Sequence, residues 1–203
     1  SQLDLPGFAE YGIGAKPLNL YAERWGNFLE QVLQGQAAAD VAVIGGGVAG
    51  CELAMAMAFA LQSAGESPRV TVIESGPKIS VVGDKARRRI LKAMSDLGIV
   101  VKTDAKIVEV TADQVLLDGQ EPVAAVLCVG AAGGSAHKWI SQTNLPQRDG
   151  FIKIGADLGV LGDEALFAVG DCASMTTGLL PKAGVFAVRA APILHHNIRV
   201  ALS

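Results

Sequence analysis

Closely spaced glycines between an apolar strand pattern and an apolar helix pattern constrain this chain more than any other feature of its sequence. Residues 40–61 read DVAVIGGGVAGCELAMAMAFAL, so Gly45, Gly47 and Gly50 form G-x-G-x-x-G. This pattern is weak alone and gains weight when it follows a strand and opens a helix. Its first glycine permits a tight turn, its second lets a pyrophosphate approach the backbone, and its third lets helix and strand pack closely. The turn therefore predicts a dinucleotide site at the start of a helix, where N–H groups and a partial positive charge favour phosphate, formed by Gly45, Gly46, Gly47, Val48, Ala49 and Gly50.

An acidic residue follows the turn where a ribose contact is expected. Glu74 ends a second apolar run and lies 24 positions after Gly50. A carboxylate there can accept hydrogen bonds from the ribose hydroxyls of an adenosine, and it repels a 2′-phosphate. Glu74 therefore favours NAD(H) over NADP(H), and Lys78 and Arg69 are nearby cations that could soften the preference.

Glu52 is the only charge in the apolar helix pattern at 48–64. We place it in the first turn of that helix. Two interpretations stay open: a favourable interaction with the helix dipole, or a position facing the nicotinamide end of a cofactor.

The order of strand and helix patterns predicts an α/β fold. Alternation of apolar strands with helices indicates a Rossmann-like parallel sheet covered on both faces, and KIVEVTADQVLLDG reads as an inserted β-hairpin that turns at residues 112–113. We expect an irregular start over 1–20 and an N-cap at Asn19. The expected helices span 20–34, 48–64 and 85–97, and the expected strands span 41–44, 70–73, 99–102 and 123–129.

Residues 131–203 have a different character. GFIKI and ALFAVGD read as strands, the second ending at Asp171. A long helix pattern spans 185–202, and Pro192 is expected to bend or interrupt it.

The composition excludes several classes of protein. The net charge is −3, aromatic residues make up 5% of the chain, and no basic block occurs, so nothing favours nucleic-acid binding. The three cysteines are scattered and form no CxxC, so we expect small buried side chains rather than a disulfide framework or a metal site, in a reducing, cytoplasmic compartment. The longest apolar run is about 14 residues, short of the roughly 20 that span a bilayer.

Three motifs together resemble one family. VAVIGGGVAGCELA, LFAVGDCA and LPKAGVFAVR occur in this order, and the chain resembles the pyridine nucleotide-disulfide oxidoreductase superfamily, flavoproteins with two dinucleotide-binding domains. It is most similar to type II NADH dehydrogenases and to the NADH-dehydrogenase-like module fused to selenide, water dikinases. The segment YGIGAKPLNLYAERWGNFLEQV resembles the lead-in to the NADH domain of that module.

The resemblance implies roles for particular residues. Gly45, Gly47, Gly50 and Glu74 would hold NADH, with Glu52 near the nicotinamide and Lys16 structural. Gly130, at the end of its strand, is a further cofactor-binding candidate. The resemblance also implies FAD contacts, with Asp171 binding the ribityl chain. The candidate FAD contacts are Gly170, Asp171, Lys182, Ala183, Gly184 and Val185.

The chain also departs from the family pattern. GIGAKP has Pro17 where the third glycine of an FAD-binding turn would stand, and the redox CxxC of the disulfide reductases is missing. We expect three parts: a connecting segment and helix over 1–35, an NAD(H)-binding domain over 36–130, and the C-terminal part of a split FAD-binding domain over 131–203. The rest of the flavin domain and an interface domain would lie outside this chain, and its start at Ser1 suggests a processed or excised segment.

The predicted function is hydride transfer from NADH to FAD and on to an acceptor such as a quinone, in the intact protein. The cofactors carry this chemistry, so we expect no catalytic side chain and no metal. A non-catalytic NAD(H)-binding regulatory or sensor module is the alternative. The expected partners are the small-molecule cofactor and the electron acceptor. Contact of the intact protein with a membrane surface stays an open alternative. We expect an unsatisfied apolar face on 131–203 that a homodimer or altered packing would cover.

Overall fold

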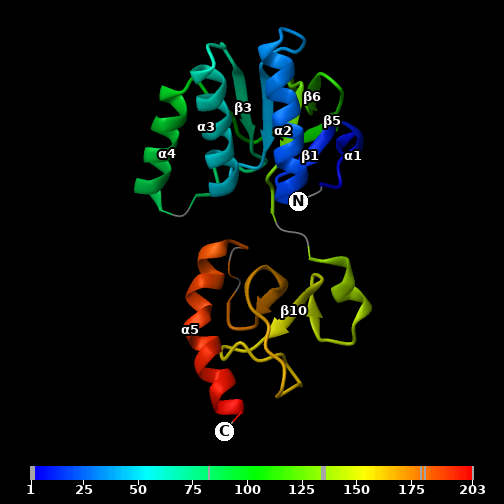
Figure 1. Cartoon of the computed structure of the whole chain (residues 1–203), viewed down its shortest axis with the longest axis vertical. Coiled ribbons are helices and arrows are strands. Elements are labelled where there is room, and N and C mark those ends of the chain that lie inside the picture. The colour runs from blue at the N-terminus through cyan, green and yellow to red at the C-terminus, as the bar shows by residue number, and fades with distance from the viewer. Residues whose placement is uncertain (1–2, 82, 134–135, 179, 181, 203) are drawn as a thin grey trace. The chain divides into compact units, whose positions relative to one another are not determined.

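The computed structural model describes residues 3–81, 83–133, 136–178, 180 and 182–202. The chain divides into two compact units, residues 1–133 and residues 134–203 (Figure 1). Among the helices of the described part, none combines the length and the apolar character needed to cross a bilayer.

Unit 1 is built around a five-stranded parallel sheet with the order β1-β8-β2-β3-β4. The predicted α/β fold is therefore confirmed. The strands are β1 Gly12–Gly14, β2 Asp40–Ile44, β3 Arg69–Ile73, β4 Val100–Lys102 and β8 Leu127–Gly130.

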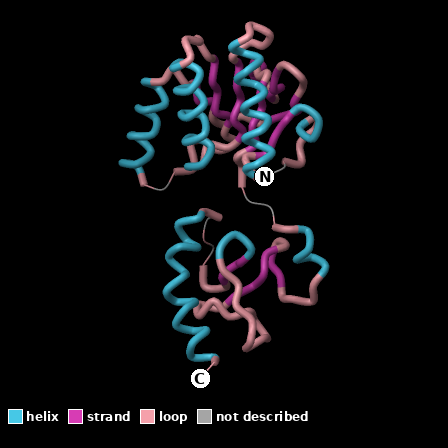
Figure 2. Tube along the Cα trace, in the orientation of Figure 1, coloured by secondary structure: helices cyan, strands magenta, loops and turns pink. Residues whose placement is uncertain are grey.

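Alternating side chains of the central strands divide the core of unit 1 between two faces, as the pleat of a strand requires. Val41 and Val43 of β2 pack in the cluster formed with the helices α2 Leu18–Leu33, α3 Val48–Ser63 and α4 Asp84–Asp96. These helices lie together beside the strands (Figure 2).

The other face of the sheet is covered by a short helix and a second, smaller sheet. Ala42 and Ile44 of β2 pack with Phe8, which lies on α1 Phe8–Tyr11. The small sheet is an antiparallel meander of β5 Ile107–Val110, β6 Gln114–Leu117 and β7 Gln120–Ala124. The hairpin predicted around residues 112–113 is the turn between β5 and β6.

Three predictions in unit 1 are wrong. The described residues 3–20 are not irregular throughout, since they contain α1 and β1, and α2 begins at Leu18 with Pro17 rather than Asn19 at its N-cap. The expected strand at 123–129 is two strands in different sheets. The chain changes sheet where the N–H of Ala125 bonds Asp113 O and the N–H of Val126 bonds Asp40 O, both at 2.8–2.9 Å.

Unit 2 has a three-stranded sheet with the order β11-β10-β9 and one long helix. Its strands and its 3₁₀ turns surround a core that contains Ile140, Ile152 and Ile154. The elements are η1 Lys138–Gln142, β9 Gln147–Arg148, β10 Phe151–Ile154, η2 Gly170–Cys172, β11 Ala173–Met175 and α5 Gly184–Ala201.

Two expectations for unit 2 need correction. ALFAVGD forms only an isolated bridge between Gly159 and Phe167, and Asp171 lies in η2, because the neighbouring segment 173–175 is the one that pairs with β10. Helix α5 continues through Pro192 without interruption. A proline removes one helical N–H and does not stop a helix that is otherwise supported.

Candidate functional site

The glycine turn lies at the carboxyl end of β2, between the ends of β8 and β3. Strand order reverses here, because the chain proceeds from β2 to β3 and β4 on one side and returns to β8 on the other. The crevice outside the strand ends at such a switch point is where ligands bind in open α/β sheets. The fold therefore places the turn where a dinucleotide is expected.

Gly45 and Gly50 are required by the geometry of the turn itself. Gly45 has φ +111°, and a Cβ there would lie 2.7 Å from the nitrogen of Ala132. A Cβ on Gly50 would lie 1.9 Å from the carbonyl oxygen of Gly45. The helix start and the strand end thus approach so closely that only glycine fits at both positions.

Gly47 differs from these two glycines because the space beside it is empty. It is the N-cap of α3 with φ −72°, and no heavy atom lies within 4 Å of a Cβ built on it. Val48 and Ala49 follow as exposed residues of the first turn, whose N–H groups have no partner within the helix. The turn therefore presents an open backbone surface with a positive dipole end, the arrangement that suits a diphosphate.

The carboxylate of Glu74 is held beside the turn by four donors of the same unit. The N–H groups of Gly46 and Gly76 each bond it at 2.9 Å, and the hydroxyls of Ser75 and Ser80 approach it at 3.3 Å. Glu74 is buried, so these donors compensate its desolvation. The two short bonds fix the carboxylate, and the two long ones leave acceptor positions that a stronger donor can take.

The structure corrects the expected positions of Arg69 and Glu52, and contact of Glu52 with a nicotinamide stays a prediction. Arg69 stands at the opposite end of β3 from Glu74 and forms a two-pronged ion pair with Asp40 at 2.6 and 2.5 Å, so it cannot soften a preference set by Glu74. Glu52 is exposed and is the fifth residue of α3, so it follows the first turn rather than lying in it.

Gly130 ends β8, and its missing side chain makes room for Phe8. A Cβ on Gly130 would lie 2.6 Å from the Phe8 ring. This packing is one reason for a glycine here, and contact of Gly130 with a cofactor stays a prediction.

The buried cysteines are unsuited to redox chemistry. Burial raises the pKa of Cys51 to about 11 and that of Cys128 to about 12. A thiol rather than a thiolate therefore predominates at neutral pH, and the thiolate is the reactive form. Within the described residues, no group of three or more His, Cys, Asp or Glu side chains could hold a metal ion.

Unit 2 contains a cavity of about 140 Å³ that brings four of the predicted flavin residues together. Gly170, Asp171, Lys182 and Ala183 line it with apolar neighbours such as Phe151. Gly184 and Val185 lie outside this lining at the exposed start of α5.

Lys182 is held in the lining of this cavity by two contacts. Its ammonium group donates to Ala173 O and lies 4.1 Å from the centre of the Phe151 ring. Burial lowers the pKa of Lys182, and the negative charge of Asp171 opposes this shift. The hydrogen bond and the ring contact therefore fix the ammonium group at the wall of the cavity.

Sequence reasoning missed the residues that support the glycine turn from the β3–α4 loop. The N–H of Ser80 bonds Gly46 O at 2.8 Å, and Ile79 is buried against Gly46. No periodic pattern marks this loop, and its serines and glycine gave only a turn signal.

The chain matches the family model described as pyridine nucleotide-disulphide oxidoreductase over residues 4–191. Its relatives include demethylphylloquinone reductase NdbB of Synechocystis sp., 33% identical over 83% of this chain and 42% of the relative. Rubredoxin-NAD(+) reductase of Ectopseudomonas oleovorans is 30% identical over 66% of this chain and 35% of the relative.

Solved structures share the fold at lower identity. An NAD-dependent persulfide reductase from A. fulgidus superposes with a TM-score of 0.76 at 19% identity, over 98% of this chain and 37% of that one. NDH2 from Plasmodium falciparum in complex with NADH gives 0.69 at 17% identity, over 86% and 42%.

This chain spans about two fifths of the length of the curated relatives that it matches. The family match nevertheless includes both the glycine turn of unit 1 and the predicted flavin residues of unit 2. The resemblance read from the three motifs is therefore confirmed, and the chain belongs to the pyridine nucleotide-disulphide oxidoreductase family.

Proposed function

We propose that this chain is the nucleotide-binding portion of an FAD-dependent NADH:acceptor oxidoreductase, with NAD(H) bound at the glycine turn of unit 1. The observation that carries this proposal is the contrast between crowded Gly45 and Gly50 and open Gly47. A turn in which two glycines are needed for packing and the third faces free space has room for a ligand against its backbone.

The surroundings of Glu74 support NADH as the nucleotide. The ribose hydroxyls can replace the two serine hydroxyls at 3.3 Å while the backbone N–H bonds at 2.9 Å stay in place. The same carboxylate repels the 2′-phosphate of NADPH. Lys78, exposed in the loop after Glu74, is the cation that could weaken this discrimination.

The cavity of unit 2 supports contact with part of an FAD. Its volume of about 140 Å³ is below the roughly 300 Å³ at which pockets for drug-sized ligands begin. Asp171 offers an acceptor for the ribityl hydroxyls of FAD, and Lys182 offers a positive charge. The start of α5 offers backbone N–H groups. These groups together fit one portion of FAD. Bound NADH and FAD would supply the redox chemistry, which is hydride transfer from NADH to the flavin and electron transfer on to an acceptor such as a quinone.

Relatives named as reductases of demethylphylloquinone and of rubredoxin support an electron-transfer role without selecting the acceptor. The site residues of this chain bind and orient the cofactors in this proposal, and no side chain is assigned an acid–base step.

Replacement of Glu74 by Gln tests the proposal. The change removes the charge and leaves one carbonyl oxygen to accept, so NADH binding should weaken by about 10-fold. NADPH should lose less, because the repulsion of its 2′-phosphate disappears. Fluorescence titration with each nucleotide measures both dissociation constants.

The exposed Glu23 on α2 provides the matched control, and Glu23→Gln should change neither constant. An unchanged ratio of NADH to NADPH affinity in Glu74→Gln would contradict the ribose role. Failure of the unaltered chain to bind either nucleotide would favour neither an oxidoreductase nor an NAD(H) sensor.

A further inference from the structure

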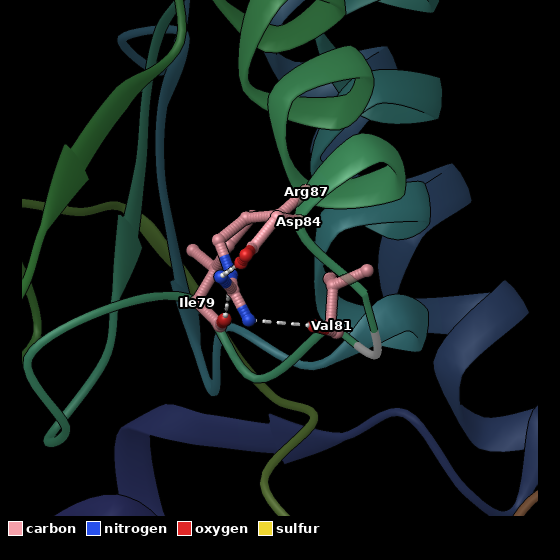
Figure 3. A network of polar contacts seen from close by, with 4 residues as sticks. All are labelled: Ile79, Val81, Asp84 and Arg87. Atoms are coloured by element: carbon pink, nitrogen blue, oxygen red, sulfur yellow. Dashed lines mark hydrogen bonds and ion pairs between the residues drawn. The ribbon is translucent and has the colours of Figure 1, made fainter.

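Arg87 is the least exposed of the three consecutive arginines on α4, and its guanidinium group points back toward the β3–α4 loop. The side chain is 18% exposed, whereas Arg88 and Arg89 are exposed residues of the same helix. Figure 3 shows Arg87 donating to the carbonyl oxygens of Ile79 and Val81 and to the carboxylate of Asp84.

Two of the three bonds hold one short piece of backbone, and the third is to the side chain of Asp84. Arg87 lies 3.3 Å from Ile79 O and 3.0 Å from Val81 O, and Asp84 orients the guanidinium group at 2.5 Å from the first turn of α4. The two carbonyls are on either side of Ser80. Arg87 therefore holds the backbone on both sides of Ser80.

Ser80 in turn joins the two halves of the dinucleotide site. Its N–H bonds Gly46 O at 2.8 Å, and its hydroxyl lies 3.3 Å from the Glu74 carboxylate. Ile79 adds an apolar contact beneath the turn, because a Cβ on Gly46 would lie 3.1 Å from its methyl group. The segment 79–81 thus supports both the phosphate-facing turn and the ribose-facing acid.

We propose that Arg87 is a positioning residue of the dinucleotide site, which holds segment 79–81 so that the glycine turn and Glu74 are in place before the nucleotide binds. This assignment rests on the function proposed for the site. A support that is ordered in advance lowers the cost of ordering the loop on binding. Lysine cannot replace it fully, because a single ammonium group lacks the planar fork that reaches two carbonyls and a carboxylate together.

The test compares variants of the 203-residue chain by two measurements. One is the NADH dissociation constant from fluorescence titration, and the other is the amide hydrogen exchange of Gly46 and Ser80 without ligand. Arg87→Ala should weaken NADH binding by about 10-fold and speed exchange at both amides. Arg87→Lys should fall between Arg87→Ala and the unaltered chain in both measurements, and it keeps the test valid if Arg87→Ala does not fold.

Two controls separate positioning from general destabilisation. Arg88→Ala removes an exposed arginine from the same helix, and Arg69→Ala removes an arginine ion pair from the opposite end of β3. Both should bind NADH within about twofold of the unaltered chain, because surface and distant changes have small effects at a separate site.

Three outcomes would overturn the assignment. Unchanged NADH affinity in Arg87→Ala, beside an unaltered chain that binds, would remove the positioning role and leave the proposed function standing. An equal loss of affinity in Arg69→Ala would mean that Arg87 acts only through overall stability. Absence of NADH binding by the unaltered chain would overturn the proposed function, and this assignment with it.

Discussion

At the scale of single residues, the three glycines of the G-x-G-x-x-G turn differ in the reason for their missing side chains. Gly45 and Gly50 allow the end of the strand and the start of the helix to approach closely. A Cβ would lie 2.7 Å from a backbone atom at Gly45 and 1.9 Å from one at Gly50. Packing within the chain does not require a glycine at position 47, since no heavy atom lies within 4 Å of a Cβ built there. The open space beside Gly47 is what the proposed approach of a diphosphate to the backbone requires.

The cysteines give a prediction at this scale. Cys51 and Cys128 are buried with pKa values raised to about 11 and about 12, so at pH 8 roughly one Cys51 in a thousand is a thiolate. The half-buried Cys172 should therefore be alkylated by iodoacetamide well before Cys51 in the folded chain, and the Cys51 rate should rise as pH increases toward 11. Mass spectrometry of the modified peptides measures the order, and Cys51 reacting first would contradict the burial.

The sequence was sufficient to predict the glycine turn and the acid that follows it, because both depend on spacing along adjacent strand and helix. It could not predict the bonds from Gly46 and Gly76 to Glu74, or the position of Arg69, because these depend on which end of β3 each residue occupies. Arg69 and Glu74 are close in sequence, but Arg69 begins the five-residue strand β3 and Glu74 follows its end, so they lie at opposite ends of an extended segment.

At the scale of elements, strongly periodic segments were predicted and short ones were not. The helices α3 and α4 and the strands β2 and β3 follow apolar patterns that local chemistry supports. The three-residue strand β1 has the sequence GIG and no apolar run, and it exists because β8 pairs with all three of its residues. Such a strand depends on its tertiary partner, which sequence periodicity does not reveal.

Phe8 makes that dependence measurable. Its side chain is fully buried, and it lies against Gly12 of β1 and Gly130 of β8, where a Cβ would come within 2.4 and 2.6 Å of its ring. Phe8→Ala should lower the free energy of unfolding of unit 1 by about 3–5 kcal/mol, because it leaves a cavity in the sheet face. Urea denaturation measures the change, with Phe59→Ala on the exposed side of α3 as the control that should cost less. Equal costs for the two variants would contradict the role of Phe8 in anchoring β1.

The same reasoning explains the mistaken strand in unit 2. ALFAVGD is apolar enough to read as a strand, but β10 pairs with 173–175 instead and leaves that run a single bridge at Phe167. Strand propensity predicted an extended segment at residues 165–171, but β10 pairs with residues 173–175, so 165–171 does not form a strand.

At the scale of the whole molecule, each of the two compact units has its own core and holds one of the two predicted cofactor sites. Helix α5 of unit 2 has no buried residue in the described structure and exposes Val188, Ile193 and Val200 among others. These exposed side chains agree with the expected apolar face. Coverage of that face by a homodimer stays a prediction, as does any membrane contact of the intact protein.

The central claim is that the open backbone at Gly47 holds the diphosphate of NADH. The most direct measurement is an NADH titration of the 203-residue chain beside Gly47→Ala and Gly26→Ala, with urea unfolding of all three. Both glycines have empty space where an added methyl group would stand, but Gly26 lies in the middle of α2, away from the turn. The account predicts that Gly47→Ala loses about 10-fold or more in NADH affinity while its unfolding free energy changes by no more than about 1 kcal/mol, and that Gly26→Ala binds as the unaltered chain does. NADH binding that is equal in all three chains would contradict it.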